Sequence, residues 1–193
     1  RFYTTLYAGL SVITEKDIAQ HGVGATATAE ASFGAGWTGG GAIGYYFLDF
    51  LSAEIAWDYR TNGTDPIRFS DGNFFEEGDY SSNIFLLNGY YHFTTVLGTP
   101  LAPYFGAGVG FVEEVDIDFE GSGIEESFSE EGAFTYQLIA GTAFVLTTHW
   151  DILADVRYLR IDGLTLDSET IPGRSSDLDY DPITLNLGVR YAF

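Results

Sequence analysis

The stretch Asp181–Phe193, DPITLNLGVRYAF, alternates with a period of two residues over most of its length. One register is apolar or aromatic and the other is small or polar: Ile183, Leu185, Leu187, Val189, Tyr191 and Phe193 against Thr184, Asn186, Gly188, Arg190 and Ala192. Because successive side chains of a β-strand point to opposite faces, this pattern predicts a strand with one apolar and one polar face. The stretch alone does not say which face is buried.

Seven earlier segments also alternate, which predicts eight strands in all. These segments are Phe2–Val12, Phe33–Phe47, Phe50–Arg60, Tyr80–Phe93, Pro103–Val112, Ala133–Leu146 and Trp150–Leu159. The connections are long after the first, third, fifth and seventh strands and short after the others, as in bacterial transmembrane barrels. The sequence therefore predicts one all-β domain over residues 1–193. We expect an eight-stranded antiparallel transmembrane up-and-down β-barrel with four long acidic extracellular loops and short periplasmic turns.

The composition excludes several other classes of protein. Hydrophobic residues make up 46% of the 193, yet no run approaches the ~18 apolar residues of a transmembrane helix. There is no cysteine, so disulfides and thiolate metal sites are excluded. The net charge of −20 argues against a nucleic-acid partner, which requires Lys and Arg on phosphates. The chain starts at Arg1, directly before a strand; we expect a removed signal sequence, although a trimmed chain would begin in the same way.

The charges separate into two groups. In the polar registers of the strands three carboxylates balance three arginines: Glu54, Asp58 and Asp155 against Arg60, Arg157 and Arg190. The long loops hold nearly all of the excess, and Glu113–Gly132 alone has nine acidic and no basic residues. Since a buried ion costs several kcal/mol unless it is paired, the balance fits a closed interior. A charge facing lipid would cost about 2–4 kcal/mol, so the polar register is predicted to face the lumen.

An eight-stranded barrel is only wide enough for side chains to fill. The predicted lumen network consists of Glu54, Asp58, Arg60, Asn88, Gln137, Asp155, Arg157, Asn186 and Arg190. Counted from the short turns, two stacked layers are expected, each with at least one arginine–carboxylate contact. The nearer layer holds Glu54, Asn88, Asp155 and Arg190, and the deeper one holds Asp58, Gln137 and Arg157. The interpretation favoured for these ions is a stabilising plug, and gating or selectivity is the alternative.

Four phrases resemble small outer-membrane barrels of the OmpA/OmpX type from Gram-negative bacteria. They are SAEIAWDY (Ser52–Tyr59), PYFGAGVGF (Pro103–Phe111), HWDILADVRYLRID (His149–Asp162) and LGVRYAF (Leu187–Phe193). The resemblance implies an outer-membrane protein with periplasmic termini, surrounded by lipid and lipopolysaccharide, that acts as a structural or adhesin-like surface protein. The stretch YDPITLNLGVRYAF (Tyr180–Phe193) also resembles the OmpW group, which is associated with the passage of small apolar molecules. A narrow channel for small or apolar solutes is therefore the alternative function.

The end of the chain carries a further resemblance. Leu187, Val189, Tyr191 and the terminal Phe193 resemble the signal by which the barrel assembly machinery recognises outer-membrane barrels. This resemblance implies that the assembly machinery is a partner during biogenesis.

The histidines do not predict an enzyme. His92 and His149 lie at short turns with no obvious nucleophile beside them. His21 could approach Ser175, Ser176 and Asp177 if their two loops fold together, but no spacing supports a catalytic triad.

The most acidic loop is the remaining distinctive feature. Glu113, Glu114, Asp116, Asp118 and Glu120 alternate along a possible extension of the preceding strand, and Glu125, Glu126, Glu130 and Glu131 could return antiparallel to it. Crowded carboxylates attract cations, and calcium is the hard, oxygen-seeking candidate, although no EF-hand spacing is present. The alternatives are a solvated acidic surface and a docking surface for an extracellular basic protein or cation-bridged lipopolysaccharide. No other cofactor is predicted.

Overall fold

The computed structural model describes residues 1–12, 16–22, 25–31, 35–64, 67–68, 74–75, 77–96, 98–121, 124–130, 133–168 and 175–193. Side chains are described for residues 1–12, 35–63, 81–96, 98–113, 133–161 and 181–193. This part of the chain contains no helix that could cross a membrane.

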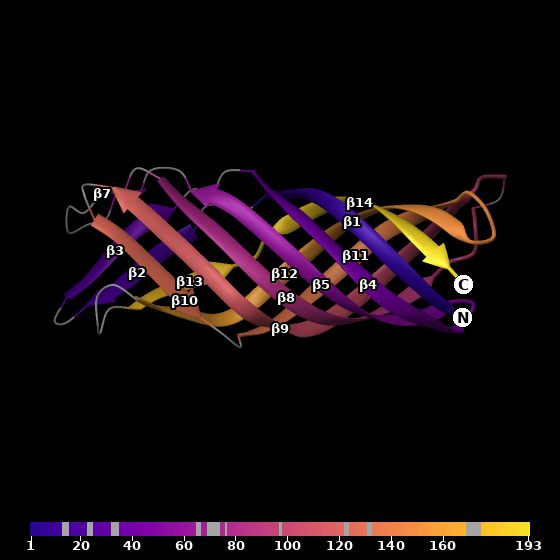
Figure 1. Cartoon of the computed structure of the whole chain (residues 1–193), viewed down its shortest axis with the longest axis horizontal. Helices are drawn as coiled ribbons and strands as arrows, with labels where there is room; N and C mark the ends of the chain where they lie inside the picture. The colour runs from indigo at the N-terminus through magenta and orange to yellow at the C-terminus, as the bar shows by residue number, and fades with distance from the viewer. Residues whose placement is uncertain are drawn as a thin grey trace.

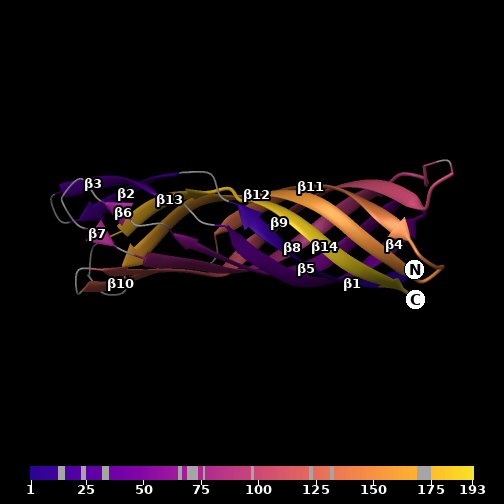
Figure 2. The ribbon, with the colours of Figure 1, turned by 90° about the horizontal axis from the view of Figure 1, so that it is seen from above.

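Eight antiparallel strands form a closed barrel (Figure 1). They are β1 (Phe2–Val12), β4 (Gly36–Leu48), β5 (Leu51–Thr64), β8 (Glu77–His92), β9 (Leu101–Gly121), β11 (Phe134–Val145), β12 (Trp150–Ser168) and β14 (Ile183–Ala192). Each strand pairs with its neighbour in sequence order, and β14 closes the barrel on β1. Both termini lie with the short turns at one end, which we call the turn end; the opposite end is the long-loop end (Figures 1 and 2).

The strand register fixes the stagger of the barrel. A path of paired residues starts at Phe2 and passes through Tyr45, Ala53, Gly89, Ala107, Leu138, Tyr158 and Ile183. It returns to β1 at Val12, ten residues beyond its start. Such a stagger requires the strands to tilt against the barrel axis, and it brings together side chains from different strand positions.

The two faces of the wall are sorted as the alternation predicts. In β14, Ile183, Leu185 and Leu187 are exposed on the outside, while Thr184 and Asn186 are buried in the lumen. The lumen is not uniformly polar, because Ile84, Leu86 and Leu159 are also buried there. Apolar side chains thus fill the space between the ionic groups, as expected in a barrel that is only wide enough for side chains.

Much of what the sequence assigned to loops is strand. β5, β9 and β12 run past the predicted ends to Thr64, Gly121 and Ser168. Further strands are β2 (Lys16–Gly22), β3 (Ala25–Ala31), β6 (Ile67–Arg68), β7 (Phe74–Phe75), β10 (Ile124–Glu130) and β13 (Ser175–Tyr180). The loop boundaries were wrong because backbone pairing with a neighbouring strand needs no apolar face, and hence no alternation that a sequence would reveal. Phe33, the predicted start of the second strand, lies outside the described residues.

The extension of β9 begins at a bulge. Asn83 pairs with Glu114 and the next residue of β8, Ile84, pairs with Val112, so Glu113 is an extra residue. Beyond it, β10 pairs antiparallel with β9, from Ile124 opposite Gly121 to Glu130 opposite Val115. The expected return of the acidic segment is therefore present in the backbone.

Candidate functional site

All nine residues of the predicted lumen network are buried inside the barrel: Glu54, Asp58, Arg60, Asn88, Gln137, Asp155, Arg157, Asn186 and Arg190. They come from β5, β8, β11, β12 and β14, whose inward registers all converge on one narrow lumen. The lumen is therefore the part of the described structure where ionic chemistry is concentrated.

Glu54 is the centre of one hydrogen-bond cluster. Its carboxylate accepts hydrogen bonds from the hydroxyls of Tyr90 at 2.7 Å and Tyr3 at 3.2 Å, and from the Asn88 amide at 3.2 Å. Asn88 accepts a further hydrogen bond from Gln137 at 2.8 Å. The ion pairs found among the described side chains do not include Glu54. Its buried carboxylate is thus held by neutral donors, which offset part of the cost of burial.

Arg157 connects opposite walls of the lumen. From β12 it donates through Nε and Nη2 to Asp155 on its own strand, at 2.9 and 3.2 Å. Its Nη1 lies 3.9 Å from Oδ1 of Asp58, on β5 across the barrel. Its guanidinium carbon also lies 4.0 Å from the ring centroid of Tyr7, whose hydroxyl donates to Asp58. A desolvated cation–π contact of this kind contributes about 2 kcal/mol. Arg157, Asp155, Asp58 and Tyr7 are all buried.

The two aspartates have further donors. Asp155 accepts hydrogen bonds from the Tyr104 hydroxyl at 2.9 Å and from the Asn186 amide at 3.0 Å. Asp58 accepts one from Nη2 of Arg60 at 2.9 Å. Each carboxylate therefore has both a cation and neutral donors, as a charge needs when it leaves water.

Arg190 does not join this cluster. It donates through Nε and Nη2 to Asp151 at 3.0 and 2.7 Å. Asp151 is its partner in the β12–β14 register, and the pair lies at the turn end because Asp151 is the second residue of β12. The predicted network did not include Asp151, because only the register between β12 and β14 shows that it stands opposite Arg190.

The predicted division into two layers is wrong. Arg157, assigned to the deeper layer, pairs with Asp155 of the nearer one, and Gln137 of the deeper layer donates to Asn88 of the nearer one. Arg157 and Asp155 lie two residues apart on one face of β12, so no boundary between layers separates them. Gln137 and Asn88 lie in one row, since both pair with Gly108, so the stagger of the strands brings their different counts to one level.

Inward-facing glycines make room for the tyrosines of the network. A Cβ at Gly40 would lie 2.7 Å from the ring of Tyr7, and one at Gly106 would lie 2.6 Å from the ring of Tyr90. Glycine inside a strand often marks such a close approach by a neighbouring group. The space that these glycines leave is occupied by aromatic side chains.

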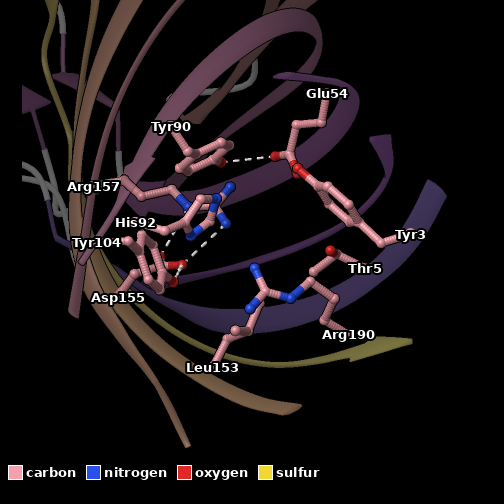
Figure 3. A pocket seen from close by; sticks show the side chains of 10 residues that line it. All are labelled: Tyr3, Thr5, Glu54, Tyr90, His92, Tyr104, Leu153, Asp155, Arg157 and Arg190. Carbon is pink, nitrogen blue, oxygen red and sulfur yellow. Dashed lines mark hydrogen bonds and ion pairs between the residues drawn. The ribbon is translucent and has the colours of Figure 1, made fainter. Parts of the chain in front are cut away.

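Two hollows lie beside this network on the turn-end side. A cavity of about 10 Å³, room for about one water molecule, lies between Glu54, Asp155, Arg157 and Arg190 (Figure 3). A larger vestibule of about 450 Å³ at the turn end is lined by Tyr46, His92 and Arg190, among others. Besides the ionic groups, the lining of the water-sized cavity includes Tyr3, Tyr90 and Tyr104.

The histidines occupy unexpected surroundings. His92 Nε2 lies 2.8 Å from Ser52 Oγ, so the statement that it has no nucleophile beside it was wrong. Ser52 lies on β5 and His92 on β8. Only the register between these strands places the two side chains together, and the sequence did not specify that register. His149 lies next to Thr148, 2.9 Å from its hydroxyl. His21 and Ser175 are direct partners in the β2–β13 pairing; Ser176 pairs with Gln20 and Asp177 with Ala19.

The acidic segment is described mainly by its backbone. Glu113 is exposed, and Glu114, Asp116, Asp118 and Glu120 follow it on β9. Glu125, Glu126 and Glu130 lie on β10, and Glu131 is outside the described residues. Among the side chains that the structure describes, no three acidic or histidine residues are placed to hold a metal ion.

The predicted assembly signal lies on the outer face at the turn end. Leu187, Val189 and Phe193 are exposed and Tyr191 is half-buried. The Tyr191 ring contacts that of Phe193 at a centroid distance of 5.1 Å and that of Trp150 at 4.8 Å. These rings form part of an aromatic girdle, as expected at a membrane interface.

Comparison with known proteins agrees with this architecture. A family model described as "Outer membrane protein beta-barrel domain" matches residues 2–193. No curated protein matches the sequence significantly. OprG, an outer membrane protein from Pseudomonas aeruginosa, has a TM-score of 0.69 at 15% identity, covering 99% of this chain and 95% of that chain.

Two further solved structures are similar. Neisserial surface protein A has a TM-score of 0.56 at 18% identity, covering 100% of this chain and 97% of that chain. The outer membrane protease OmpT from Escherichia coli has a TM-score of 0.54 at 10% identity, covering 100% of this chain and 96% of that chain. At these identities the likeness shows the fold alone. Because one of these folds belongs to a protease, the fold does not decide whether the chain is an enzyme.

Proposed function

Because this chain belongs to the outer membrane protein β-barrel domain family, we propose that it is a closed, non-enzymatic anchor that presents an acidic surface outside the cell. It is a transmembrane barrel of a Gram-negative outer membrane. The proposed orientation places the termini and the turn end in the periplasm and the long-loop end outside. Charge distribution supports this orientation, because the excess negative charge lies in the long loops.

The plug at Arg157 is the observation that supports a closed barrel. A solute crossing the lumen would have to displace a side chain that contacts Asp155, Asp58 and Tyr7 at once. Removing one partner of a buried ion pair costs about 3–5 kcal/mol, so spontaneous opening would be rare.

Conductance in a planar bilayer tests this proposal. Wild-type protein, inserted and folded, is expected to give no discrete openings, whereas Arg157→Ala is expected to give them. Thr4→Ala, which changes a residue outside the lumen network, is the matched control and should remain silent. Stable openings in the wild type would contradict the closed anchor. They would favour the alternative of a narrow channel for small or apolar solutes.

The long-loop end is the proposed interaction surface. The register places three glutamates in one row across three strands, since Glu120 of β9 pairs with both Glu77 of β8 and Glu125 of β10. Asp79 and Asp118 stand opposite one another in a nearby row. Like charges directly opposite each other destabilise a sheet unless counter-charges gather there. A basic extracellular protein, or lipopolysaccharide bridged by cations, would supply them.

Calcium is the proposed counter-ion for these rows, with Glu113, Glu114, Asp116, Asp118 and Glu120 on β9 as the candidate ligands. Titration calorimetry with calcium on the folded barrel tests the proposal. Asp118→Asn with Glu120→Gln is expected to remove the measured heat. Asp17→Asn with Glu30→Gln removes another opposed acidic pair, between β2 and β3, and should leave it unchanged. If both variants lost the same amount of binding heat, calcium would be attracted by the overall negative charge and not held at a site. If the wild type gave no binding heat, the calcium site would be contradicted.

The terminal strand is the proposed contact with the assembly machinery. Its exposed apolar register, with Leu187, Val189 and Phe193, is available to a partner before the barrel closes on β1. The same register contacts lipid once the barrel is in the membrane.

A further inference from the structure

The lipid-facing wall contains a groove beside β4. Its volume is about 450 Å³, and residues of β1, β4, β5 and β8 line it. Leu6 and Trp57 stand on either side of Gly41, which pairs with both. The floor is therefore the bare backbone of β4, and the groove lies where an ordinary strand would carry a side chain.

Packing inside the barrel does not explain why Gly41, or Gly39 on the same outward face of β4, is a glycine. A Cβ at Gly39 would meet nothing closer than 3.7 Å. One at Gly41 would meet the flexible end of Leu6 at 3.2 Å and, at an ordinary contact distance of 3.5 Å, the carbonyl oxygen of Thr5. Inward Gly40 differs, because its Cβ would lie 2.5 Å from the carbonyl oxygen of Trp57. Glycine within a strand weakens it and often marks a close approach by a ligand. The outward glycines therefore leave space that the fold itself does not require.

The walls of the groove are apolar. Leu6, Ile43 and Ile55 are exposed by 66, 65 and 67%, and Trp57 by 42%. Gly41 lies four residues from Tyr45, whose ring belongs to the turn-end girdle with Phe2 and Phe47. Four residues of a strand tilted by 35–45° rise by roughly 10 Å, which places the groove among acyl chains and away from headgroups.

We propose that this groove holds one acyl chain of a phospholipid from the turn-end leaflet. It is continuous with the exposed apolar band that contacts the membrane, and its lining matches a chain of methylene groups. A chain lying along β4 would pack its methylenes on the glycine backbone, with Leu6 and Trp57 at its sides. The assignment to a phospholipid rests on the proposed orientation, with the turn end in the periplasm.

Photocrosslinking tests the proposal with a phosphatidylcholine that carries a diazirine halfway along one acyl chain. The full barrel is folded into vesicles of this lipid, irradiated, and mapped by peptide mass spectrometry. Leu138 on β11 is the reference, because it lies seven residues from the turn end of its strand, as Gly41 does on β4. Labelling of residues 41–43 and 55–57 is expected to exceed labelling around Leu138 several-fold.

Two variants sharpen the test. Gly41→Leu fills the groove and is expected to remove the excess labelling. Gly89→Leu adds the same side chain at another outward glycine, where no atom lies within 4 Å, and should leave the excess unchanged. A heat-modifiable gel shift verifies that each variant is folded.

Uniform labelling around the wild-type barrel would overturn the proposal without any variant. So would excess labelling that persists in folded Gly41→Leu. Less labelling of residues 41–43 and 55–57 than around Leu138 would also overturn it, because the groove would then be shielded from lipid. Conductance has no bearing on these outcomes, so an open barrel would contradict the proposed function and leave this inference standing.

Discussion

The guanidinium carbon of Arg157 lies 4.0 Å from the ring centroid of Tyr7, and both residues contact the carboxylate of Asp58. Arg157 comes from β12, Tyr7 from β1 and Asp58 from β5, on the wall opposite β12. One side chain thereby joins distant parts of the wall through the middle of the lumen. The stability of the barrel should therefore depend on it.

Arg157→Ala is expected to lower the free energy of unfolding by about 3–5 kcal/mol, because it leaves Asp155 without its cation in a buried site. Urea unfolding of the vesicle-inserted protein, followed by gel shift, measures the loss. Arg157→Lys keeps the charge but not the two-point contact with Asp155, so its loss should be intermediate. A loss below about 1 kcal/mol for the alanine variant, the size of an exposed ion pair, would contradict a stabilising plug.

Glu54 should be replaceable by an amide but not by a hydrocarbon. Glu54→Leu would leave the donors of Tyr3, Tyr90 and Asn88 without their acceptor, at about 1–3 kcal/mol for each buried group left unpaired. Glu54→Gln keeps one carbonyl acceptor and should cost less. The same urea unfolding measures both. Equal stability of the leucine variant and wild type would show that these hydrogen bonds add nothing.

Adjacent glycines of β4 should respond in opposite ways to alanine. Gly40→Ala would force a methyl group against Tyr7 and Asp58 and should destabilise the barrel by about 1–3 kcal/mol. Gly39→Ala adds a methyl group on the outside with only ordinary contacts, and should be neutral or slightly stabilising. Unfolding midpoints of the two variants provide the comparison. A larger loss at Gly39 would mean that the inward and outward registers are misassigned.

Serine at Tyr191 and Phe193 together should sharply lower the yield of inserted protein in cells, because it removes the end of the proposed assembly signal. The heat-modifiable fraction in isolated outer membranes measures this yield. Phe2→Ser with Tyr45→Ser is the matched control, since these two aromatic residues also contact each other in the turn-end girdle, at 4.9 Å. Equal yields from the two double variants would assign the effect to the girdle and not to a terminal signal.

The alternation from Asp181 to Phe193 and in seven earlier segments predicted the eight strands and the sorting of their faces. The prediction succeeded because the two faces of each strand contact different surroundings, so the polarity of each residue indicates which face it is on. The inward position of Glu54, Asp155 and Arg157 was predictable for the same reason, since a charge facing lipid is too costly. The strands beyond the membrane were missed, because both of their faces can meet water and no alternation marks them.

The partners inside the lumen were decided by the tertiary structure. Residues of β1, β5 and β12 meet in the lumen because of the ten-residue stagger. This stagger is a property of the closed sheet and cannot be predicted from the sequence of any single strand. It directs Arg157 toward Asp58 on the opposite wall. Asp155, in contrast, lies two residues from Arg157 on the same strand, and Asp151 lies opposite Arg190 in the register of two adjacent strands. The groove at Gly41 has the same origin, since its sides are residues that only the register brings together. Local alternation determined which side of the wall each residue faces, and closure of the barrel determined which residues meet.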